Sequence, residues 1–457
     1  MSRRPEPTRP PRERILVCGV LFPEQAEEHD GPLSEAKGLV SAAGADVLEG
    51  DSPLIQRRSA PDASTLMGRG KVGEVRAAIE SLAPDAVLVD NDLTPAHIRN
   101  LEKAWQKRVL DRSELILDIF AARARTAQAR LQVELAQMEY LRPRLKRMWT
   151  HLERMEGAVG TRGPGETQLE TDRRLVAKRI QDLKGRLRDI EERKRREVHS
   201  RGEVFTVGLV GYTNAGKSTL LNRLTGADEF VADMPFATLD TRTRQWTLSD
   251  GRVVLVSDTV GFLQRLPHHL VASFHATLEE ALNVELLVHV VDAAHPDAAV
   301  QMRAVDETLA RLTSRTPEVL VFNKMDRVDD PLHAQPLAKG RAEELAFVSA
   351  HTGFGLERLE RAVHARLDAR SPVVEVRISP TDGRGIASLK AAGTILDERM
   401  DGAEEFVLTL RVLDGTLGAL RSTLGARARF QVLQAAAQPF YKGDESGAPA
   451  PDGGAPA

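Results

Sequence analysis

The segment Gly211–Ser218 constrains the fold of this 457-residue chain more than any other feature. It fits the pattern G-x-x-x-x-G-K-[ST], and it lies between an apolar run, Val204–Val210, and a segment of helical pattern, Ser218–Leu224. Glycines in such a loop let backbone N–H groups curl around an anion, and the N-terminus of the following helix adds its positive dipole end. The sequence therefore predicts an α/β domain with a phosphate-binding loop between a strand and a helix.

The residue types in this loop assign the first contacts to a nucleotide. Lys217 is expected to reach the β- and γ-phosphates and to take part in catalysis, and the Ser218 hydroxyl is expected to bind Mg²⁺. The loop residues predicted to contact the nucleotide are Gly211, Tyr212, Thr213, Asn214, Ala215, Gly216, Lys217, Ser218 and Thr219.

Further motifs complete the phosphate and metal site. The apolar run Arg252–Ser257 ends in Asp258, which is expected to hold Mg²⁺ through a water. The N–H of Gly261 is expected to donate a hydrogen bond to the γ-phosphate during catalysis. A threonine that closes on Mg²⁺ and the γ-phosphate must lie between the loop and Asp258. Thr238 is the preferred candidate for this metal and catalytic role, and Thr241 is the alternative.

The identity of the nucleotide base is predicted from two segments later in the sequence. The strand-like run Glu318–Phe322 leads into Asn323, Lys324 and then Asp326. A carboxylate at Asp326 can accept hydrogen bonds from N1–H and from the exocyclic amine of guanine, a pair that adenine does not offer. Ser349 and Ala350 follow another apolar run and supply a backbone contact to the guanine oxygen. The predicted ligands are GTP and GDP with Mg²⁺, and the predicted reaction is GTP hydrolysis.

The residue after Gly261 is Phe262, where many GTPases have a glutamine that orients the attacking water. Phenylalanine cannot hydrogen-bond a water molecule. We therefore expect slow intrinsic hydrolysis that a partner stimulates. The alternative is that another residue has taken over the role without functional consequence.

A long helical hairpin is predicted upstream of the phosphate loop. Two apolar stripes with spacings of three and four residues are separated by a glycine-rich break, Glu156–Thr167, that cannot continue a helix. The stripes consist of Leu131, Leu135, Met138, Leu141, Leu145, Met148, Leu152 and Met155, and of Val176, Ile180, Leu183, Leu187 and Ile190. Two antiparallel arms of about 30 residues would each reach roughly 45 Å. Pro143 should kink or shorten the first arm.

The hairpin also carries the positive charge of the chain. Residues 121–200 contain 20 Lys and Arg against 12 Asp and Glu, although the whole chain has a formal net charge of −3. A basic block on an acidic protein favours a surface that meets a polyanion. Composition alone leaves open a pair of exposed helices with solvated charges.

The remaining segments complete a multidomain α/β architecture. The C-terminal α+β unit is predicted to contain strands at Val373–Ile378 and Phe406–Val412 and a helix at Gly385–Met400. From the N-terminus, the predicted units are a disordered basic arm at 1–14, a small parallel α/β domain at 15–112 and the helical hairpin at 113–200, with its tip at 156–167. A GTPase domain follows at 201–371, with a mostly parallel sheet and helices on both faces. The last units are the small α+β domain at 372–442 and a disordered tail at 443–457.

Several segments together resemble the HflX family of GTPases. They are Gly68–Val72, Val89–Leu93, Val109–Phe120, Gly160–Glu170, Pro235–Asp240 and Asp258–Phe262, and the resemblance extends over roughly residues 15–371. Thr241 and Arg242 stand where the family usually has a proline, and His269 stands where it often has an aspartate.

The resemblance implies a ribosome-associated GTPase that binds the large subunit and, in its GTP state, separates stalled or idle subunits. A basic hairpin with a Gly-Pro-Gly tip suits insertion into a folded RNA groove. The candidate RNA contacts are Arg162, Arg173, Arg174, Lys178 and Arg179.

Other functions remain open from the sequence. The main alternative is a ribosome-assembly or RNA-binding scaffold in which GTP turnover is incidental; a regulator of a membrane protease and an RNA-remodelling ATPase are further ones. Gly68–Lys71 leaves a second nucleotide site as an alternative, and a helix-capping turn is the preferred interpretation. A single cysteine, Cys18, favours the cytoplasm, and the lack of a long apolar run argues against stable membrane insertion. The chain is expected to be a monomer, with peripheral membrane association left open.

Overall fold

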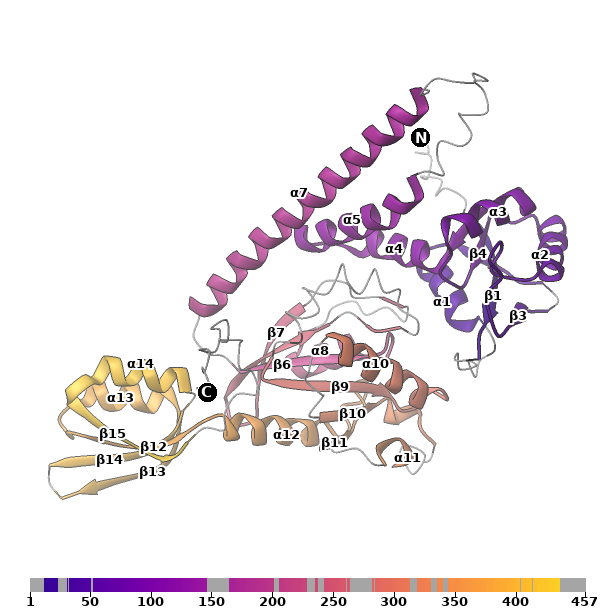
Figure 1. The fold of residues 1–457 in the computed structure, drawn as a ribbon. Coiled ribbons are helices and arrows are strands. Elements are labelled where there is room, and N and C mark those ends of the chain that lie inside the picture. Colours follow the sequence, from indigo (N-terminus) through magenta and orange to yellow (C-terminus); the bar gives the residue numbers. More distant parts are fainter. Residues whose placement is uncertain are drawn as a thin grey trace, which may run out of the picture.

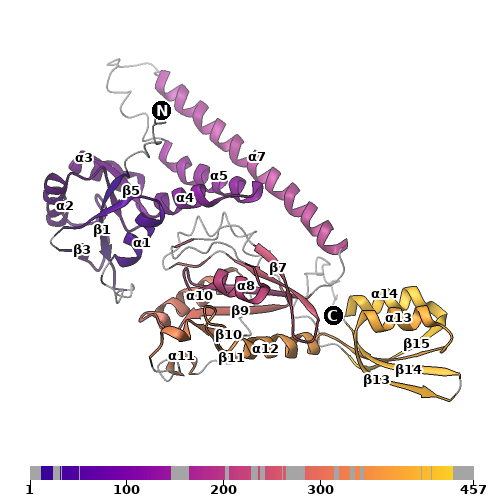
Figure 2. The same ribbon diagram turned by 180° about the vertical axis from the view of Figure 1, so that it is seen from behind.

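The computed structural model comprises an N-terminal α/β unit, a long helical arm, a central α/β domain and a C-terminal unit (Figure 1). In both views the N-terminal and C-terminal units lie on opposite sides of the central domain (Figure 2). The structure describes residues 12–23, 31, 33–50, 52–145, 164–200, 205–227, 235–236, 242–259, 261–263, 282, 284–312, 319–329, 335–339, 344–402, 404–412 and 414–435.

The N-terminal unit is a parallel sheet in the order β2-β1-β4-β5, with β3 also paired to β1. Alternate side chains of β1 enter different cores: Ile15 and Val17 face one core, and Leu16, Cys18 and Val20 face the other. The elements are β1 Arg14–Leu21, α1 Ser34–Ala42, β2 Asp46–Leu48, β3 Leu54–Arg57, α2 Arg69–Leu82, β4 Ala86–Val89, α3 Pro95–Trp105 and β5 Arg108–Asp111.

The first arm of the predicted hairpin is divided into two helices. Helix α4 (Arg112–Arg123) packs against α1 of the N-terminal unit. Helix α5 (Ala127–Leu141) starts anew at Thr126, whose side chain accepts a hydrogen bond from Ala129 N. Pro143 lies in the short 3₁₀ turn η1 (Arg142–Arg144) that follows α5. Helix α5 therefore ends just before the proline, Leu145 is again helical, and residues 146–163 of the arm lie outside the described residues.

The second arm, α7, spans Pro164–Ser200 and has 37 residues. It begins at Pro164, so the prediction that the break extends to Thr167 was wrong at its C-terminal end. Proline is favoured at the first position of a helix, because the N–H it lacks would have no partner there. Residues 156–163 of the predicted tip, including Arg162, lie outside the described residues.

Helices α5 and α7 run antiparallel (Figure 1) and pack through the predicted apolar stripes. Leu131 and Leu135 of α5 are buried against Ile180, Leu183 and Leu187 of α7. Two ion pairs flank this contact and are formed by Glu134 with Arg179 and by Glu139 with Lys184. Met148, Leu152 and Met155 lie outside the described residues.

The central domain has the predicted mostly parallel sheet, in the order β11-β10-β9-β6-β8-β7. Among its described strands, only β7, which the sequence prediction missed, runs antiparallel to its neighbour. Helices cover both faces, and the apolar strand residues are buried beneath them. The elements are β6 Thr206–Gly211, α8 Lys217–Thr225, β7 Arg242–Thr247, β8 Val253–Asp258, β9 Leu286–Asp292, α10 Ala298–Leu312, β10 Val319–Asn323, η2 Met325–Arg327, α11 Gln335–Ala338, β11 Glu344–Phe347 and α12 Leu356–Ala369.

The C-terminal unit is an antiparallel sheet in the order β13-β14-β12-β15, with α13 and α14 on one face. The helix predicted to extend to Met400 was wrong: α13 ends at Ala392 and β13 begins at Thr394. Gly393 between them adopts an extended conformation, and the following residues pair with β14. The elements are β12 Val373–Ile378, α13 Gly383–Ala392, β13 Thr394–Asp401, β14 Glu405–Arg411, α14 Asp414–Leu424, η4 Gly425–Arg427 and β15 Ala428–Gln434.

Candidate nucleotide site

The phosphate loop connects the end of β6 to the start of α8 at the edge where the parallel strands end. Gly211 and Gly216 have positive φ angles of 153° and 90°. A Cβ atom on Gly211 would lie 2.2 Å from Val290 O, and one on Gly216 would lie 2.3 Å from Asn323 Nδ2. Both positions therefore require glycine. At these two glycines the loop backbone packs directly against β9 and against Asn323 at the end of β10.

Lys217 and Gly261 lie together, as the sequence predicts. The Lys217 side chain is buried, and its Nζ donates to Gly211 O at 3.0 Å and to Tyr212 O at 2.8 Å. A Cβ atom on Gly261 would lie only 3.1 Å from that Nζ. Two backbone hydrogen bonds join the neighbouring Phe262 to Gly211 and Thr213. The segment that follows β8 is thus fixed directly against the phosphate loop.

Burial lowers the pKa of Lys217 from its ordinary value to about 8, and the charge of Asp258 opposes part of this shift. Phosphates bind the ammonium form, so a bound nucleotide should raise this pKa again. Above pH 8 the nucleotide-free protein carries a neutral amine that must take up a proton before it binds phosphate.

Nucleotide affinity is therefore expected to fall as the pH rises above about 8, approaching a tenfold loss per pH unit for one linked proton. Titration calorimetry with GDP at pH 7.0, 8.0 and 8.8, in buffers of different ionisation enthalpy, measures both the affinity and the proton uptake. Affinity that stays constant across this range, without proton uptake, would contradict the proposed role of the Lys217 ammonium.

The predicted Mg²⁺ residues Ser218 and Asp258 also meet. Ser218 Oγ donates to Asp258 Oδ2 at 2.6 Å, and Asp258 is fully buried at the end of β8. A hydroxyl beside a carboxylate is a set of hard oxygen donors, which is the kind that Mg²⁺ prefers. The residues present thus fit the metal. Thr238 and Thr241 lie outside the described residues, whereas Thr219 lies in the first turn of α8.

The predicted base-pocket residues are joined to one another and to the phosphate loop by hydrogen bonds. Asn323 Nδ2 donates to Ala215 O at 2.9 Å, and its Oδ1 accepts from Ala350 N at 3.0 Å. Ser349 Oγ donates to Asp326 Oδ1 at 2.5 Å. This hydrogen bond is the main reason why the pKa of Asp326 lies below its ordinary value. Asp326 is thus an ionised acceptor at neutral pH, as recognition of guanine requires.

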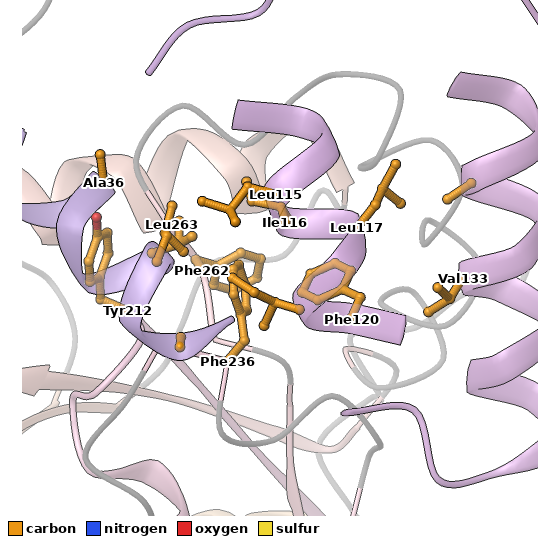
Figure 3. Packing of buried hydrophobic residues seen from close by; sticks show 14 of the residues in the cluster. Ala36, Leu115, Ile116, Leu117, Phe120, Val133, Tyr212, Phe236, Phe262 and Leu263 are labelled. Carbon is orange, nitrogen blue, oxygen red and sulfur yellow. The ribbon is translucent and has the colours of Figure 1, made fainter. Parts of the chain in front are cut away.

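Phe262 does not point into solvent beside the phosphate loop. It is 1% exposed and belongs to an apolar cluster that joins the central domain to α1 and α4 (Figure 3). In this cluster Phe120 of α4 meets Phe236 edge to face, with a centroid distance of 4.6 Å. Phe236 lies two residues before Thr238. Helices α1 and α4 therefore pack against the segments that contain Phe236 and Phe262, which are close in sequence to the predicted catalytic residues Thr238 and Gly261.

A polar connection runs beside this cluster, and the sequence prediction missed it. The Tyr212 hydroxyl in the phosphate loop donates to Glu35, which pairs with Arg112. Arg112 also donates to Asp90 at 2.5 Å, and both of these side chains are at most 2% exposed. Tyr212 and Glu35 are 177 residues apart. No local sequence pattern can reveal such a contact.

The segment Gly68–Lys71 has the geometry of a helix start. Gly68 precedes α2, and its N–H donates to Gln56 Oε1 at 2.8 Å. Lys71 pairs with Glu74 of the same helix. These contacts favour the interpretation as a capping turn.

Comparison with known proteins identifies the family. Residues 30–121 match the model of the GTP-binding GTPase N-terminal region, 123–201 that of the GTP-binding GTPase middle region, and 206–324 that of the 50S ribosome-binding GTPase. GTPase HflX of Escherichia coli (strain K12) is 42% identical over 375 residues, covering 81% of this chain and 87% of that protein. This chain belongs to the HflX family of GTPases. GTPase HflX of Magnetococcus marinus is 41% identical over 415 residues, which are 90% of this chain and 94% of that protein.

Membership of the HflX family confirms the resemblance seen in the motifs and establishes GTP hydrolysis, with GTP, GDP and Mg²⁺ as ligands. Among solved structures, a GTP-binding protein from Sulfolobus solfataricus in complex with GDP is 22% identical. That comparison covers 77% of this chain and 98% of that one, with a TM-score of 0.40. Within the part of the chain that the structure describes, no helix is both long and apolar enough to cross a membrane.

Proposed function

We propose that this HflX-family GTPase binds the large ribosomal subunit through the α5–α7 arm and uses GTP binding and hydrolysis to separate stalled or idle ribosomes. The observation that carries the proposal is the arm itself. Helix α7 has 37 residues, about 55 Å at 1.5 Å per residue. Between residues 170 and 190 its exposed side chains include Arg173, Lys178, Arg186 and Arg188. The match of residues 206–324 to a model described as 50S ribosome-binding GTPase supports the same partner.

The residues at the phosphate loop have distinct roles in this proposal. Lys217 binds the β- and γ-phosphates, and the N–H of Gly261 donates to the γ-phosphate. Ser218, Asp258 and Thr238 are the proposed Mg²⁺ residues; the bound ion would neutralise charge on the β- and γ-phosphates. Water attacks the γ-phosphorus in line with the departing GDP. Phe262 offers this water no hydrogen bond, so hydrolysis is slow until a partner orders the site.

Exposure and ion pairing favour some of the proposed RNA contacts on α7 over others. Arg173 and Lys178 are exposed, and Arg174 forms an open ion pair with Glu170 at 3.5 Å. Arg179 pairs with Glu134 of α5, so part of its charge stabilises the hairpin. Phosphate contacts from such exposed cations supply affinity that depends on salt. Arg173 and Lys178 are therefore the strongest candidates.

The double substitution Arg173→Ala/Lys178→Ala is expected to weaken binding to large ribosomal subunits by about tenfold at moderate salt and to reduce the salt slope by about two, because two phosphate contacts are lost. Basal GTP hydrolysis should stay unchanged. Co-sedimentation at several KCl concentrations measures both effects. The matched control, Arg188→Ala/Arg193→Ala, removes the same charge from α7 farther from the tip and should bind within twofold of the wild type. Equal losses in both variants would refute a contact surface near the tip.

A further inference from the structure

One carboxylate near the guanine pocket belongs to none of the recognised motifs. Asp292 is the last residue of β9, and the strand register places it opposite Asn323, the last residue of β10. Its Oδ2 atom lies 2.7 Å from Lys324 Nζ, with the two side chains only 11% and 16% exposed. Its Oδ1 atom accepts a hydrogen bond from Ala294 N at 3.1 Å. The strand end and a backbone donor therefore fix this carboxylate in place.

Lys324 is held at both ends of its side chain. Its backbone is in the left-handed region, with φ of 62°, between the two motif residues Asn323 and Asp326. Its methylene chain passes the phosphate loop, since a Cβ atom on Gly216 would lie 4.0 Å from Lys324 Cε. Its ammonium group then reaches Asp292. A lysine side chain is otherwise flexible, so the ion pair with Asp292 restricts the side chain of Lys324 to one conformation.

The other polar residues of the pocket are anchored in the same way. Asn323 joins the phosphate loop to Ala350, and Asp326 is held by Ser349. We infer that Asp292 is a positioning residue for guanine-nucleotide binding: by pairing with the Lys324 ammonium, it holds the lysine methylene chain as a preformed wall of the base pocket. Asp326 forms the hydrogen bonds that select guanine, whereas Asp292 holds the methylene chain of Lys324 in place beside the base. Asp292 therefore contributes to affinity without contributing to the choice of base.

The substitution Asp292→Asn keeps the size of the side chain and removes its charge. It is expected to weaken GDP and GTP binding equally, by about tenfold, because a hydrogen bond between two charged groups is lost. The preference for GDP over IDP should stay unchanged, because Asp326, the residue assigned to the 2-amino group, is not altered. The control Asp329→Asn removes an exposed carboxylate three residues after Asp326 and should bind within twofold of the wild type. Titration calorimetry with GDP, GTP and IDP measures these affinities.

Two further variants separate positioning from a general structural effect. In a Lys324→Met background, Asp292→Asn should cause less than a twofold further loss of GDP affinity. Asp292→Glu keeps the carboxylate and should bind GDP within threefold of the wild type. A full tenfold loss in the Lys324→Met background, a Glu variant as weak as the Asn variant, an altered GDP-to-IDP preference, or unchanged affinity in Asp292→Asn would each overturn the inference.

Discussion

Replacing Lys217 by alanine is expected to lower GTP affinity by at least about 100-fold and GDP affinity by at least about tenfold. The ammonium group lies at the phosphate loop, 2.8 to 3.0 Å from two loop carbonyl oxygens, and it is buried. Charge-assisted contacts to phosphates contribute about 1.5 to 3 kcal/mol each, and Lys217 is expected to make two with GTP and one with GDP. Equilibrium binding of fluorescent analogues of GTP and GDP measures both losses.

A matched control keeps this measurement specific. Lys339 is an exposed lysine of the same domain, after the short helix α11, and Lys339→Ala should bind nucleotide as the wild type does. A Lys217→Ala protein that keeps its thermal unfolding temperature without nucleotide but binds GDP within threefold of the wild type would show that the phosphate site lies elsewhere. ATP hydrolysis that survives in this variant would restore the hypothesis of an RNA-remodelling ATPase.

The second large effect is expected at the base. Asp326→Asn should lower GTP affinity by about 100-fold or more and raise affinity for XTP by a similar factor. The Asn amide offers a donor where the carboxylate offered an acceptor, and xanthine has an oxygen where guanine has the 2-amino group. The Ser349 hydroxyl should remain able to orient the Asn side chain, since it already donates to Oδ1.

Competition between GTP and XTP for hydrolysis by the two proteins measures this exchange of preference. Asp329→Asn, which removes a charge close by without reaching the pocket, should keep the preference for GTP. If Asp326→Asn still selects GTP over XTP by the wild-type factor, the base pocket has been assigned to the wrong residues.

The sequence predicted those parts of the fold in which function dictates local residue types. Gly216, Lys217 and Ser218 must be adjacent to cradle a phosphate, so their motif is readable and the structure brings it beside Asp258. The stripes on α5 and α7 were also readable, because burial at Leu135 and Leu183 imposes helical spacing. Local chemistry and local periodicity leave signals within a short window.

The errors arose where long-range contacts decide the structure. Residues 394–400 carry a pattern that suits a helix, but pairing with β14 makes them a strand. Strand β7 is polar along most of its length and is defined by its pairing with β8. Asp292 and Glu35 belong to no motif, and their importance follows only from their contacts with Lys324 and Tyr212. Such residues become recognisable only when the fold is known.

The contact between the N-terminal unit and the phosphate loop bears on how the switch is controlled. Phe262 stands where a water-orienting residue would be expected and is instead packed among Leu115, Phe120 and Phe236 (Figure 3). A partner that accelerates hydrolysis must therefore provide, or bring into place, a group that orients the attacking water. This is the physical reason why the proposed function depends on the ribosome.

The most direct test of this account is GTP hydrolysis at saturating GTP, measured with and without purified large ribosomal subunits, together with co-sedimentation in GDP and in a non-hydrolysable GTP analogue. The account predicts slow turnover by the protein alone, stimulation of at least about tenfold by the subunits, and stronger co-sedimentation with the analogue than with GDP. Turnover that is unchanged by the subunits, with no co-sedimentation in either nucleotide, would contradict the account and favour a scaffold in which GTP turnover is incidental.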